Sequence, residues 1–372
     1  MPTVAVAGSI WGVRAPLGAD STEVVTGAAG DARLRSLAAT PLVVSPMAGG
    51  PSTVELVVAA SRAGAFAFLA GGYKKADDLR TEMAAVRAAG VGAFGVNLFV
   101  PGAATDAPDQ LDAFLASLRP LAASLGVELG AGEWDDDDYP TKLALVLADV
   151  PAVVSFTFGV PDPEAVRALQ RSGSVVMVTV TTPEEADAAL RVAPDALCLQ
   201  GAEGGAHRGS LANVDRPDAD RPLRALLASV RRRTLLPLVA AGGVAGPDDV
   251  ADLLGRGAAL VQAGTAFLRC PESGAQPAAK DALGADVFTE TAVTRAFSGR
   301  RARALINAMV LEHPDAPAAY PEINNATRPL RAAAARAGDA GHMSLYAGTG
   351  FRAAEARPAA EVVERLVSGW RR

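Results

Sequence analysis

Eight short apolar runs recur along this chain of 372 residues, and a helix-like stretch follows each of them. Polar residues rarely interrupt the runs, which is typical of strands that are buried on both faces of a parallel sheet. Eight alternating strands and helices predict a closed (β/α)8 TIM barrel, with a doubly wound open sheet as the alternative. The predicted strands are 42–47, 65–70, 94–99, 153–158, 175–180, 196–200, 238–241 and 259–263.

Three segments between these strands carry the start signals of helices. Ser52 and Glu55 have the spacing of a capping box, with Ser52 as the N-cap. Thr182 and Gly246 each precede a proline and acidic residues, a combination that favours the first helical turn. These signals support the alternation of strands and helices.

Two stretches are too long to be simple connections and indicate additions to the barrel. The stretch 101–150 separates the third and fourth strands and contains two predicted helices, 110–125 and 141–148. The second stretch follows the eighth strand, and we expect its helices and a Pro-rich segment, 314–329, to form a helical cap over the barrel mouth. The predicted organisation is an N-terminal extension (1–38), a barrel core (39–268), the cap (269–357) and a C-terminal helix that closes the barrel (358–372).

Charge and cysteine content exclude several classes of protein. With 35 basic and 41 acidic residues, a net charge of -6 argues against a nucleic-acid binder that neutralises phosphates. Cys198 and Cys270 cannot form a disulfide framework and fit a reducing cytoplasm.

No apolar stretch reaches the roughly 18 residues that a bilayer crossing needs, so we expect no membrane partner. The acidic run 135–138 is interpreted as a solvated loop, and no metal site is expected.

The carboxyl ends of the strands are where the active sites of such barrels lie. Gly242 and Gly243 follow the seventh predicted strand, and Gly264 and Thr265 follow the eighth. Glycine turns expose N–H groups that bind anions, and these two strand ends often hold phosphate in barrels. The sequence therefore predicts a phosphate site there.

Three further kinds of side chain stand at strand ends. His207 follows the Gly-rich end of the sixth strand, and because imidazole exchanges protons near neutral pH, we consider it a candidate catalytic residue. Asn97 and Gln200 end apolar strands, where a buried amide must bond either a neighbouring strand end or a ligand such as a flavin pyrimidine. Met47 and Ala48 are placed to pack against a flat ring.

Several motifs, in this order along the chain, resemble those of the class I nitronate monooxygenases, formerly called 2-nitropropane dioxygenases. The resemblance covers residues 41–366 and rests on the segments 46–53, 68–73, 95–101, 155–159, 200–209, 294–300, 320–321 and 345–350. It implies an FMN-dependent barrel that uses O2 to oxidise alkyl nitronates, propionate 3-nitronate above all, to a carbonyl compound and nitrite. No nicotinamide cofactor is implied.

The resemblance also implies roles for individual residues. His207 matches the catalytic histidine of the family, and Tyr73, Tyr320 and Tyr346 fall in motifs that we place at the substrate pocket. Together with the residue types above, it predicts FMN contacts from Met47, Ala48, Asn97, Gln200, Gly205, Gly242, Gly243, Gln262, Ala263, Gly264 and Thr265.

One departure from the family pattern precedes His207. The family usually has Glu-Ala-Gly-Gly-His, whereas residues 203–207 of this chain read Glu-Gly-Gly-Ala-His. If the position of Ala206 needs a positive φ, its Cβ costs on the order of 1 kcal/mol.

Two other functions stay open at the level of sequence. One is an FMN-dependent NAD(P)H reductase of quinones or enoyl thioesters on the same barrel, and the other is a non-catalytic or biosynthetic relative. The expected partners are a nitronate or nitroalkane and O2, in a cytoplasmic monomer or homodimer.

Overall fold

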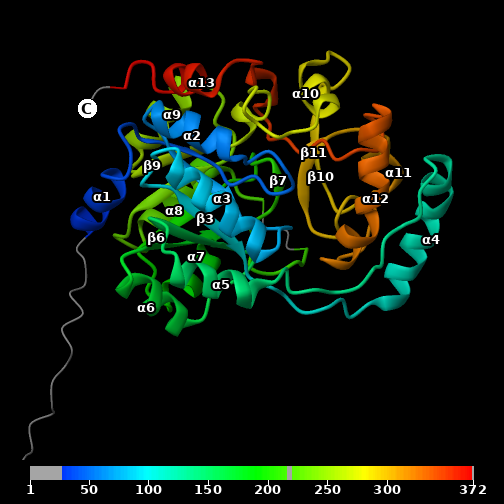
Figure 1. Cartoon of the computed structure of the whole chain (residues 1–372), viewed down its shortest axis with the longest axis horizontal. Helices are drawn as coiled ribbons and strands as arrows, with labels where there is room; N and C mark the ends of the chain where they lie inside the picture. Colours follow the sequence, from blue (N-terminus) through cyan, green and yellow to red (C-terminus); the bar gives the residue numbers. More distant parts are fainter. Residues whose placement is uncertain (1–26, 216–219, 371–372) are drawn as a thin grey trace, which may run out of the picture.

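A computed structural model describes residues 27–215 and 220–370 and confirms the predicted closed barrel (Figure 1). The barrel strands are β1 (Leu42–Val44), β2 (Phe66–Ala70), β3 (Gly95–Phe99), β4 (Val153–Thr157), β5 (Val175–Val180), β6 (Ala196–Gln200), β8 (Leu238–Ala241) and β9 (Leu260–Ala263). All neighbours are parallel, and β9 closes the ring by pairing with β1, where Leu42 lies opposite Val261.

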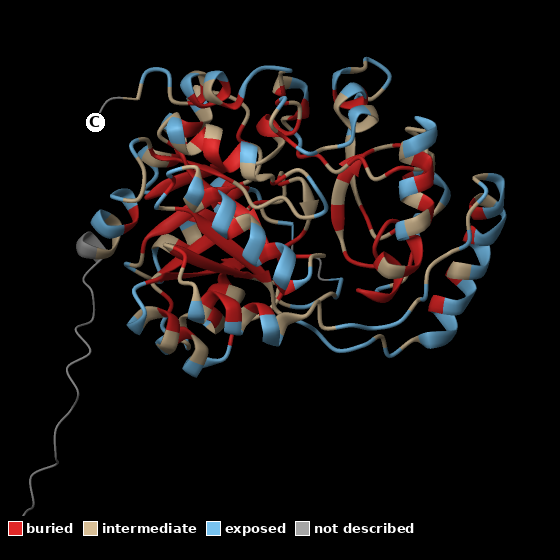
Figure 2. Cartoon of the chain, viewed as in Figure 1, coloured by how far each residue is buried: buried red, intermediate tan, exposed pale blue. Residues whose placement is uncertain are grey.

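Helices surround the barrel, and the buried residues lie in the strands and in the helix faces turned toward them (Figure 2). A second apolar cluster, which includes Phe66, Phe68 and Met177, fills the barrel interior. The outer helices are α2 (Val54–Arg62), α3 (Ala76–Ala88), α5 (Tyr139–Ala148), α6 (Pro163–Arg171), α7 (Pro183–Leu190), α8 (Leu223–Arg231), α9 (Pro247–Gly255) and α13 (Ala359–Leu366). Thr182 and Gly246 are the N-caps of α7 and α9, as predicted.

The prediction that Ser52 caps α2 is wrong. Thr53 is the N-cap, and its Oγ1 accepts a hydrogen bond from the Leu56 N–H (3.0 Å). The Ser52 hydroxyl accepts instead from the Met47 N–H (2.9 Å). This bond closes the turn after β1 and holds the backbone of Met47 at the barrel mouth.

Part of the predicted N-terminal extension packs against the barrel. Helix α1 (Gly27–Arg35) carries Leu34, which is 3% exposed and belongs to the cluster in the barrel interior. The described part of this segment therefore packs against the barrel through a buried apolar contact. Residues 1–26 of the predicted extension lie outside the described residues.

The cap contains a small sheet as well as the predicted helices. Its elements are the 3-10 turn η1 (Thr265–Phe267), α10 (Pro277–Gly284), β10 (Thr291–Thr294), β11 (Ala302–Leu305), α11 (Ala308–Glu312), α12 (Glu322–Ala337) and the 3-10 turn η2 (Phe351–Ala353). The antiparallel sheet has the order β10-β11-β7, and β7 (Ala206–His207) comes from the loop after β6. A cap built of helices alone was predicted because these strands are short and only partly apolar.

The segment 314–329, which the sequence marks as Pro-rich, is helical in its second half. Helix α12 begins at Glu322 and contains Pro329. Within this helix the Ala326 carbonyl accepts a hydrogen bond from the Gly130 N–H (2.8 Å), which comes from the first insertion. Pro329 has no N–H to donate to the Asn325 carbonyl, and the contact with Gly130 supports the helix at the residue next to it.

The first insertion also forms part of the cap. Helix α4 (Pro108–Ser124) lies beside α12 (Figure 1), and its Phe114 and Leu118 share an apolar cluster with Ile323 and Leu330. None of the helices that the structure describes combines the length and the apolar character that a bilayer crossing requires.

Candidate active site

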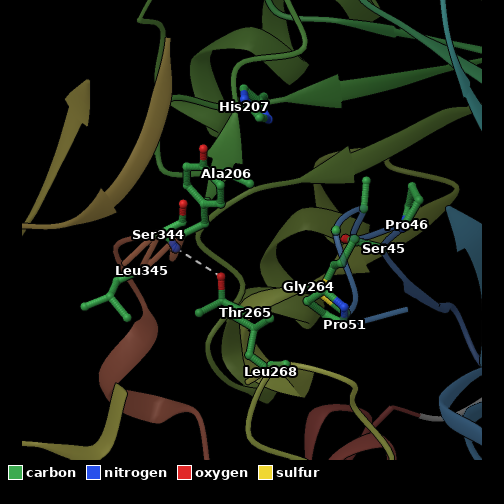
Figure 3. A pocket seen from close by; sticks show the side chains of 18 of the residues that line it. Ser45, Pro46, Pro51, Ala206, His207, Gly264, Thr265, Leu268, Ser344 and Leu345 are labelled. Carbon is green, nitrogen blue, oxygen red and sulfur yellow. Dashed lines mark hydrogen bonds between the residues drawn. The ribbon is translucent and has the colours of Figure 1, made fainter. Parts of the chain in front are cut away.

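A cavity of about 790 Å³ lies between the barrel mouth and the cap (Figure 3). Of the residues predicted for the site, all except Tyr320 line this cavity. The lining residues that the sequence predicted are Met47, Ala48, Tyr73, Asn97, Gln200, Gly205, His207, Gly242, Gly243, Gln262, Ala263, Gly264, Thr265 and Tyr346. The structure thus brings together residues from six strand ends and from the cap.

The turn after β8 and the loop after β9 form a narrow cradle. Gly243 has φ +72°, a backbone conformation that favours glycine. Gly205 and Gly348 approach so closely that a Cβ on Gly205 would lie 2.4 Å from the Gly348 nitrogen. The Thr265 hydroxyl accepts a hydrogen bond from that nitrogen (3.0 Å), which ties the C-terminal segment to the strand end (Figure 3).

Two amide side chains present oxygen atoms in the cavity. Gln262 is 8% exposed, and its Oε1 is buried without a hydrogen-bond partner among the described residues. Asn97 is 3% exposed, and its Nδ2 donates hydrogen bonds to Ser155 Oγ (2.9 Å) and Thr157 Oγ1 (3.0 Å). These bonds occupy the nitrogen end of the amide. Because an unpaired buried acceptor is costly, Gln262 indicates a ligand that donates a hydrogen bond.

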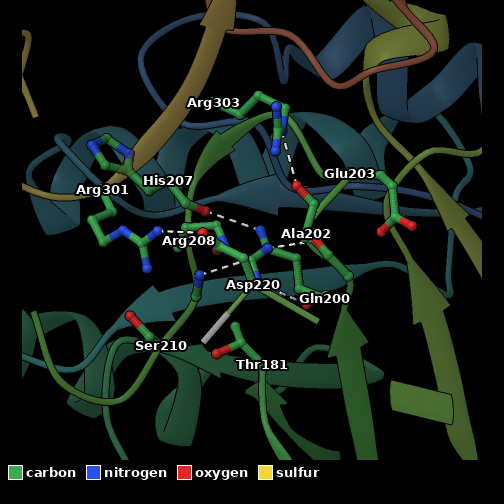
Figure 4. Close-up of polar contacts among 12 residues, drawn as sticks. Thr181, Gln200, Ala202, Glu203, His207, Arg208, Ser210, Asp220, Arg301 and Arg303 are labelled. Carbon is green, nitrogen blue, oxygen red and sulfur yellow. Dashed lines mark hydrogen bonds and ion pairs between the residues drawn. The ribbon is translucent and has the colours of Figure 1, made fainter. Parts of the chain in front are cut away.

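Gln200 lines the cavity, but its side chain is used to fold the loop after β6. Its Nε2 donates to the His207 carbonyl (2.9 Å), and its Oε1 accepts from Arg208 Nη1 (3.0 Å) and the Gly209 N–H (2.8 Å) (Figure 4). Arg208 is itself buried and pairs with Asp220. Of the two partners left open for this amide, the structure shows bonds to the neighbouring loop, and contact of Gln200 with a cofactor stays a prediction.

His207 is fixed from two sides. Its backbone pairs with Ala302 of β11 in the cap sheet, and its carbonyl binds Gln200 of the barrel. In the side chain, Nε2 lies 2.8 Å from the Ser298 hydroxyl. Nδ1 makes no hydrogen bond to a residue that the structure describes, which leaves this nitrogen for a ligand.

The imidazole does not titrate near neutral pH, contrary to the expectation from its residue type. Burial, followed by the positive charges of Arg300 and Arg331, lowers the pKa of His207 to about 3. The ring is surrounded by Phe158, Tyr320 and Tyr346, whose centroids lie 5.3–5.8 Å from its own. His207 is therefore neutral in the free protein at working pH.

Tyr320 is not among the residues that line the cavity, so its place in a substrate pocket stays a prediction. Its hydroxyl donates to the Tyr73 hydroxyl (3.1 Å), and its ring packs against His207 and Phe158. Burial raises the pKa of Tyr73, Tyr320 and Tyr346, so all three phenols stay protonated. Linear sequence could not separate the tyrosines that face the cavity from the one packed behind them.

The acidic run 135–138 is not a simple solvated loop, because its side chains bond to the loop after β2, to α5 and to α12. Asp137 accepts a hydrogen bond from the Tyr73 N–H (2.8 Å) and lies 2.9 Å from the Nζ of Lys142, which is only 1% exposed. Asp135 accepts from the Asn325 amide of α12 (2.7 Å). Among the described residues, no group of His, Cys, Asp and Glu is suited to hold a metal ion.

Sequence reasoning missed the arginines of the site. Arg300 is 5% exposed, and its guanidinium carbon lies 3.9 Å from the centroid of the Phe158 ring. Arg328, Arg331 and Arg336 line the cavity from α12. The available signal was their helical spacing, but only Arg328 lies within the segment 314–329 that the sequence marks as Pro-rich, and Arg331 and Arg336 follow it.

Ala206 has φ +60°, so the departure from the family pattern falls where glycine is favoured. We expect Ala206→Gly to stabilise the fold by about 0.5–1 kcal/mol, because the relief of backbone strain in the folded protein exceeds the cost of the entropy that glycine adds to the unfolded chain. Urea unfolding measures this difference. The control is Ala116→Gly on the exposed face of α4, which should lose about 1 kcal/mol. Equal losses in both variants would contradict the strain at Ala206.

The closed barrel and the cavity at its mouth place this chain in the class of (β/α)8-barrel enzymes, which bind their ligands at the carboxyl ends of the strands. Within this class the chain belongs to the nitronate monooxygenase family, whose sequence profile matches residues 32–369. This membership confirms the resemblance found in the sequence. Members of the family are flavin-dependent oxidoreductases that act on small molecules with oxygen, and the chain is an oxidoreductase of this kind.

Individual relatives agree with this membership. The chain is 38% identical over 340 residues to a nitronate monooxygenase from Pseudomonas aeruginosa, which covers 88% of the chain and 95% of the relative. It superposes on the nitroalkane oxidase from Streptomyces ansochromogenes with a TM-score of 0.88 and 44% identity, over 90% of the chain and 97% of that structure. FabK from Thermotoga maritima, at 23% identity and a TM-score of 0.67 over 90% of the chain and 94% of that structure, shares the fold.

Proposed function

We propose that the protein binds FMN in the cavity and uses O2 to oxidise alkyl nitronates to a carbonyl compound and nitrite. The observation that carries this proposal is the charge of the cavity. Its lining includes three arginines and His207, and it contains no Asp or Glu among the described residues. A wall of this kind favours an anionic ligand, which a nitronate is and a neutral nitroalkane is not.

The residues present fit a flavin mononucleotide. Gly243 and Gly264 in the cradle offer N–H groups for a phosphate. The Thr265 hydroxyl, which accepts from the Gly348 N–H, can donate its own proton to the same phosphate. The unpaired Oε1 of Gln262 supplies an acceptor for an N–H or hydroxyl of the cofactor. Met47 closes the barrel side of the cavity with an apolar surface.

The bound flavin supplies the electron transfer between substrate and oxygen, and the side chains of the chain supply orientation and charge. His207 presents a neutral ring, and the role of its free Nδ1 depends on the tautomer. With the proton on Nδ1 the ring donates to an oxygen of the nitronate, and with the proton on Nε2 the bare Nδ1 takes a proton from a nitroalkane. Ser298 holds the opposite ring nitrogen and prevents the ring from turning. Tyr73, at the mouth, limits the access of water.

The cofactor proposal is tested by substitution in the turn after β8. Gly243→Ala forces a side chain into a φ of +72°, with its Cβ 2.8 Å from that of Glu203. We expect the affinity for FMN to fall about 10-fold or more. The measurement is the visible absorption of the purified protein and the release of FMN on dilution. Gly246→Ala, in the same loop with open space around the added Cβ, is the matched control.

The activity is tested by oxygen uptake with an alkyl nitronate. Uptake by the FMN-loaded protein, with release of nitrite, supports the proposal. No uptake would favour a relative that has lost the reaction. Rapid anaerobic bleaching of the flavin by NADH would instead favour the NAD(P)H-dependent reductase that the sequence left open.

We also infer a cytoplasmic location and a monomer or homodimer. The location is supported by Cys198 and Cys270, which are both free and buried. Gel filtration with light scattering determines the oligomeric state.

A further inference from the structure

The side chain behind the ring of His207 is Ser298, whose Oγ lies 2.8 Å from Nε2. Ser298 is 1% exposed and does not line the cavity, so it can act on a substrate only through the ring. The contact by itself leaves the direction of the hydrogen bond open, because a neutral imidazole carries its one proton on either nitrogen.

The backbone that follows Ser298 turns back onto its hydroxyl. Gly299 has φ +77°, and a Cβ at this position would collide with the Ala319 carbonyl. The turn brings both backbone groups of Arg300 to Ser298 Oγ, which accepts from the Arg300 N–H and donates to the Arg300 carbonyl, each at 3.3 Å. Arg300 is 5% exposed, and its carbonyl has no other hydrogen-bond partner in the part of the chain that the structure describes.

A count of donors and acceptors around Ser298 selects one tautomer of His207. A hydroxyl has one proton to donate and two lone pairs that accept. One lone pair takes the Arg300 N–H, and the proton goes to the buried Arg300 carbonyl. The second lone pair is left for Nε2, so all the neighbouring groups are satisfied only when Nε2 carries the ring proton. The opposite tautomer turns the hydroxyl toward Nε2 and leaves a buried carbonyl unpaired, which is costly.

We propose that Ser298 is a positioning residue, which holds His207 in the Nε2–H tautomer and leaves a bare Nδ1 that faces the cavity. The consequence for the reaction deepens the proposed function and rests on it. Nδ1 takes the proton from the carbon that bears the nitro group of a neutral nitroalkane. The electron pair of that C–H bond passes into the nitro group, which gives the anionic nitronate and an imidazolium.

The surroundings of the ring agree with a base that is neutral until its substrate is bound. Burial, followed by Arg300 and Arg331, lowers the pKa of His207, so the free ring carries a single proton. After the transfer Nδ1–H faces the anionic nitronate, whose charge offsets the cost of a buried imidazolium. Nε2–H keeps its bond to Ser298 throughout, so the hydroxyl does not have to turn.

Nitrogen NMR of the imidazole tests the tautomer directly and does not depend on turnover. The chain has 3 histidines, so ring labelling with ¹⁵N gives few side-chain signals, and the His207→Asn variant identifies those of His207. At neutral pH we expect the FMN-loaded wild type to show a protonated Nε2 and an unprotonated Nδ1. A protonated Nδ1 would overturn the proposal.

The Ser298→Ala variant tests whether the serine holds the tautomer. Without the hydroxyl Nε2–H has no acceptor, so the ring proton should move to Nδ1, which faces the cavity. We therefore expect the ratio of kcat/KM for nitroethane to kcat/KM for ethylnitronate to fall about 10-fold or more. Ser117→Ala is the control, because that hydroxyl bonds the Phe114 carbonyl on the exposed face of α4, and it should change neither the tautomer nor the ratio.

Two results for Ser298→Ala count against its role: a ring proton that stays on Nε2, or an unchanged substrate ratio. If this variant does not fold, the spectrum of the wild type still decides the tautomer. Absence of oxygen uptake with both substrates would count against the proposed function, whereas the ring signals remain measurable. The two failures can therefore be told apart.

Discussion

His207→Asn is expected to lower kcat/KM for neutral nitroalkanes by about 100-fold or more, while FMN stays bound. The amide of asparagine can occupy roughly the position of Nδ1, so it still offers a hydrogen bond to the substrate, but it cannot accept a proton. For nitronates, which are already deprotonated, we expect a smaller loss of about 10-fold. Steady-state oxygen uptake with both substrates, together with the flavin spectrum, measures the two effects.

The matched variants separate the two ring nitrogens. In His207→Gln the amide lies nearer to the position of Nε2 and can keep the contact with Ser298, but it leaves the Nδ1 position empty. We therefore expect it to impair nitronate oxidation more than His207→Asn does. His342→Asn is the control, because His342 pairs with Asp339 outside the cavity. Undiminished nitroalkane oxidation by His207→Asn would remove the proton-accepting role.

His207 also determines how the free energy of unfolding changes at acidic pH. Burial, then Arg300 and Arg331, hold the pKa of His207 at about 3, below its usual value of 6.5. Between these pH values the unfolded chain binds a proton that the folded chain does not. Stability is therefore lost as the pH falls from 6.5 toward 3, and His207→Asn should lose less over that range. No break in kcat/KM from His207 is expected between roughly pH 5 and 8.

Lys142→Met is expected to destabilise the fold by about 3 kcal/mol, because it leaves Asp137 without its counter-charge in a largely buried position. Burial already raises the pKa of Asp137, and Lys142 opposes that rise. Without the lysine the carboxyl pKa rises further, so the variant becomes less stable as the pH increases through that pKa. Urea unfolding at two pH values measures both the loss and its pH dependence.

The loss in Lys142→Met should extend to the active site, because Asp137 holds the backbone of Tyr73 at the cavity mouth. We expect a higher KM for the nitronate. The double variant Lys142→Met, Asp137→Asn is the control: it removes the unpaired charge and keeps an oxygen for the Tyr73 N–H. If the single variant is as stable as the wild type, the ion pair does not support this loop.

The barrel could be predicted because its strands are buried on both faces. Such strands read as apolar runs, and the bounds of β5, β6 and β8 agree with the predicted runs. The cap could not be predicted in the same way. Strands β10 and β11 are short and partly exposed, and α12 keeps its helix through Pro329 with support from Gly130 of another insertion.

The site residues divide in the same manner. Glycines such as Gly243 and Gly348 were recognisable as strand-end or motif residues, since their function depends on the backbone. The roles of Gln200 and Tyr320 were not recognisable, because a side chain that faces a ligand and one that folds a loop have the same sequence signal.

By itself, therefore, the sequence determined the barrel, the family and the set of strand ends at which a ligand binds, because these depend on local burial and on ordered motifs. Only the tertiary structure decided the charge state of His207, since the three aromatic rings and two arginines around it come from distant segments. It likewise decided that the guanidinium groups of α12 face the cavity without a carboxylate partner among the described residues, because pairing of charges depends on distance in space and not along the chain.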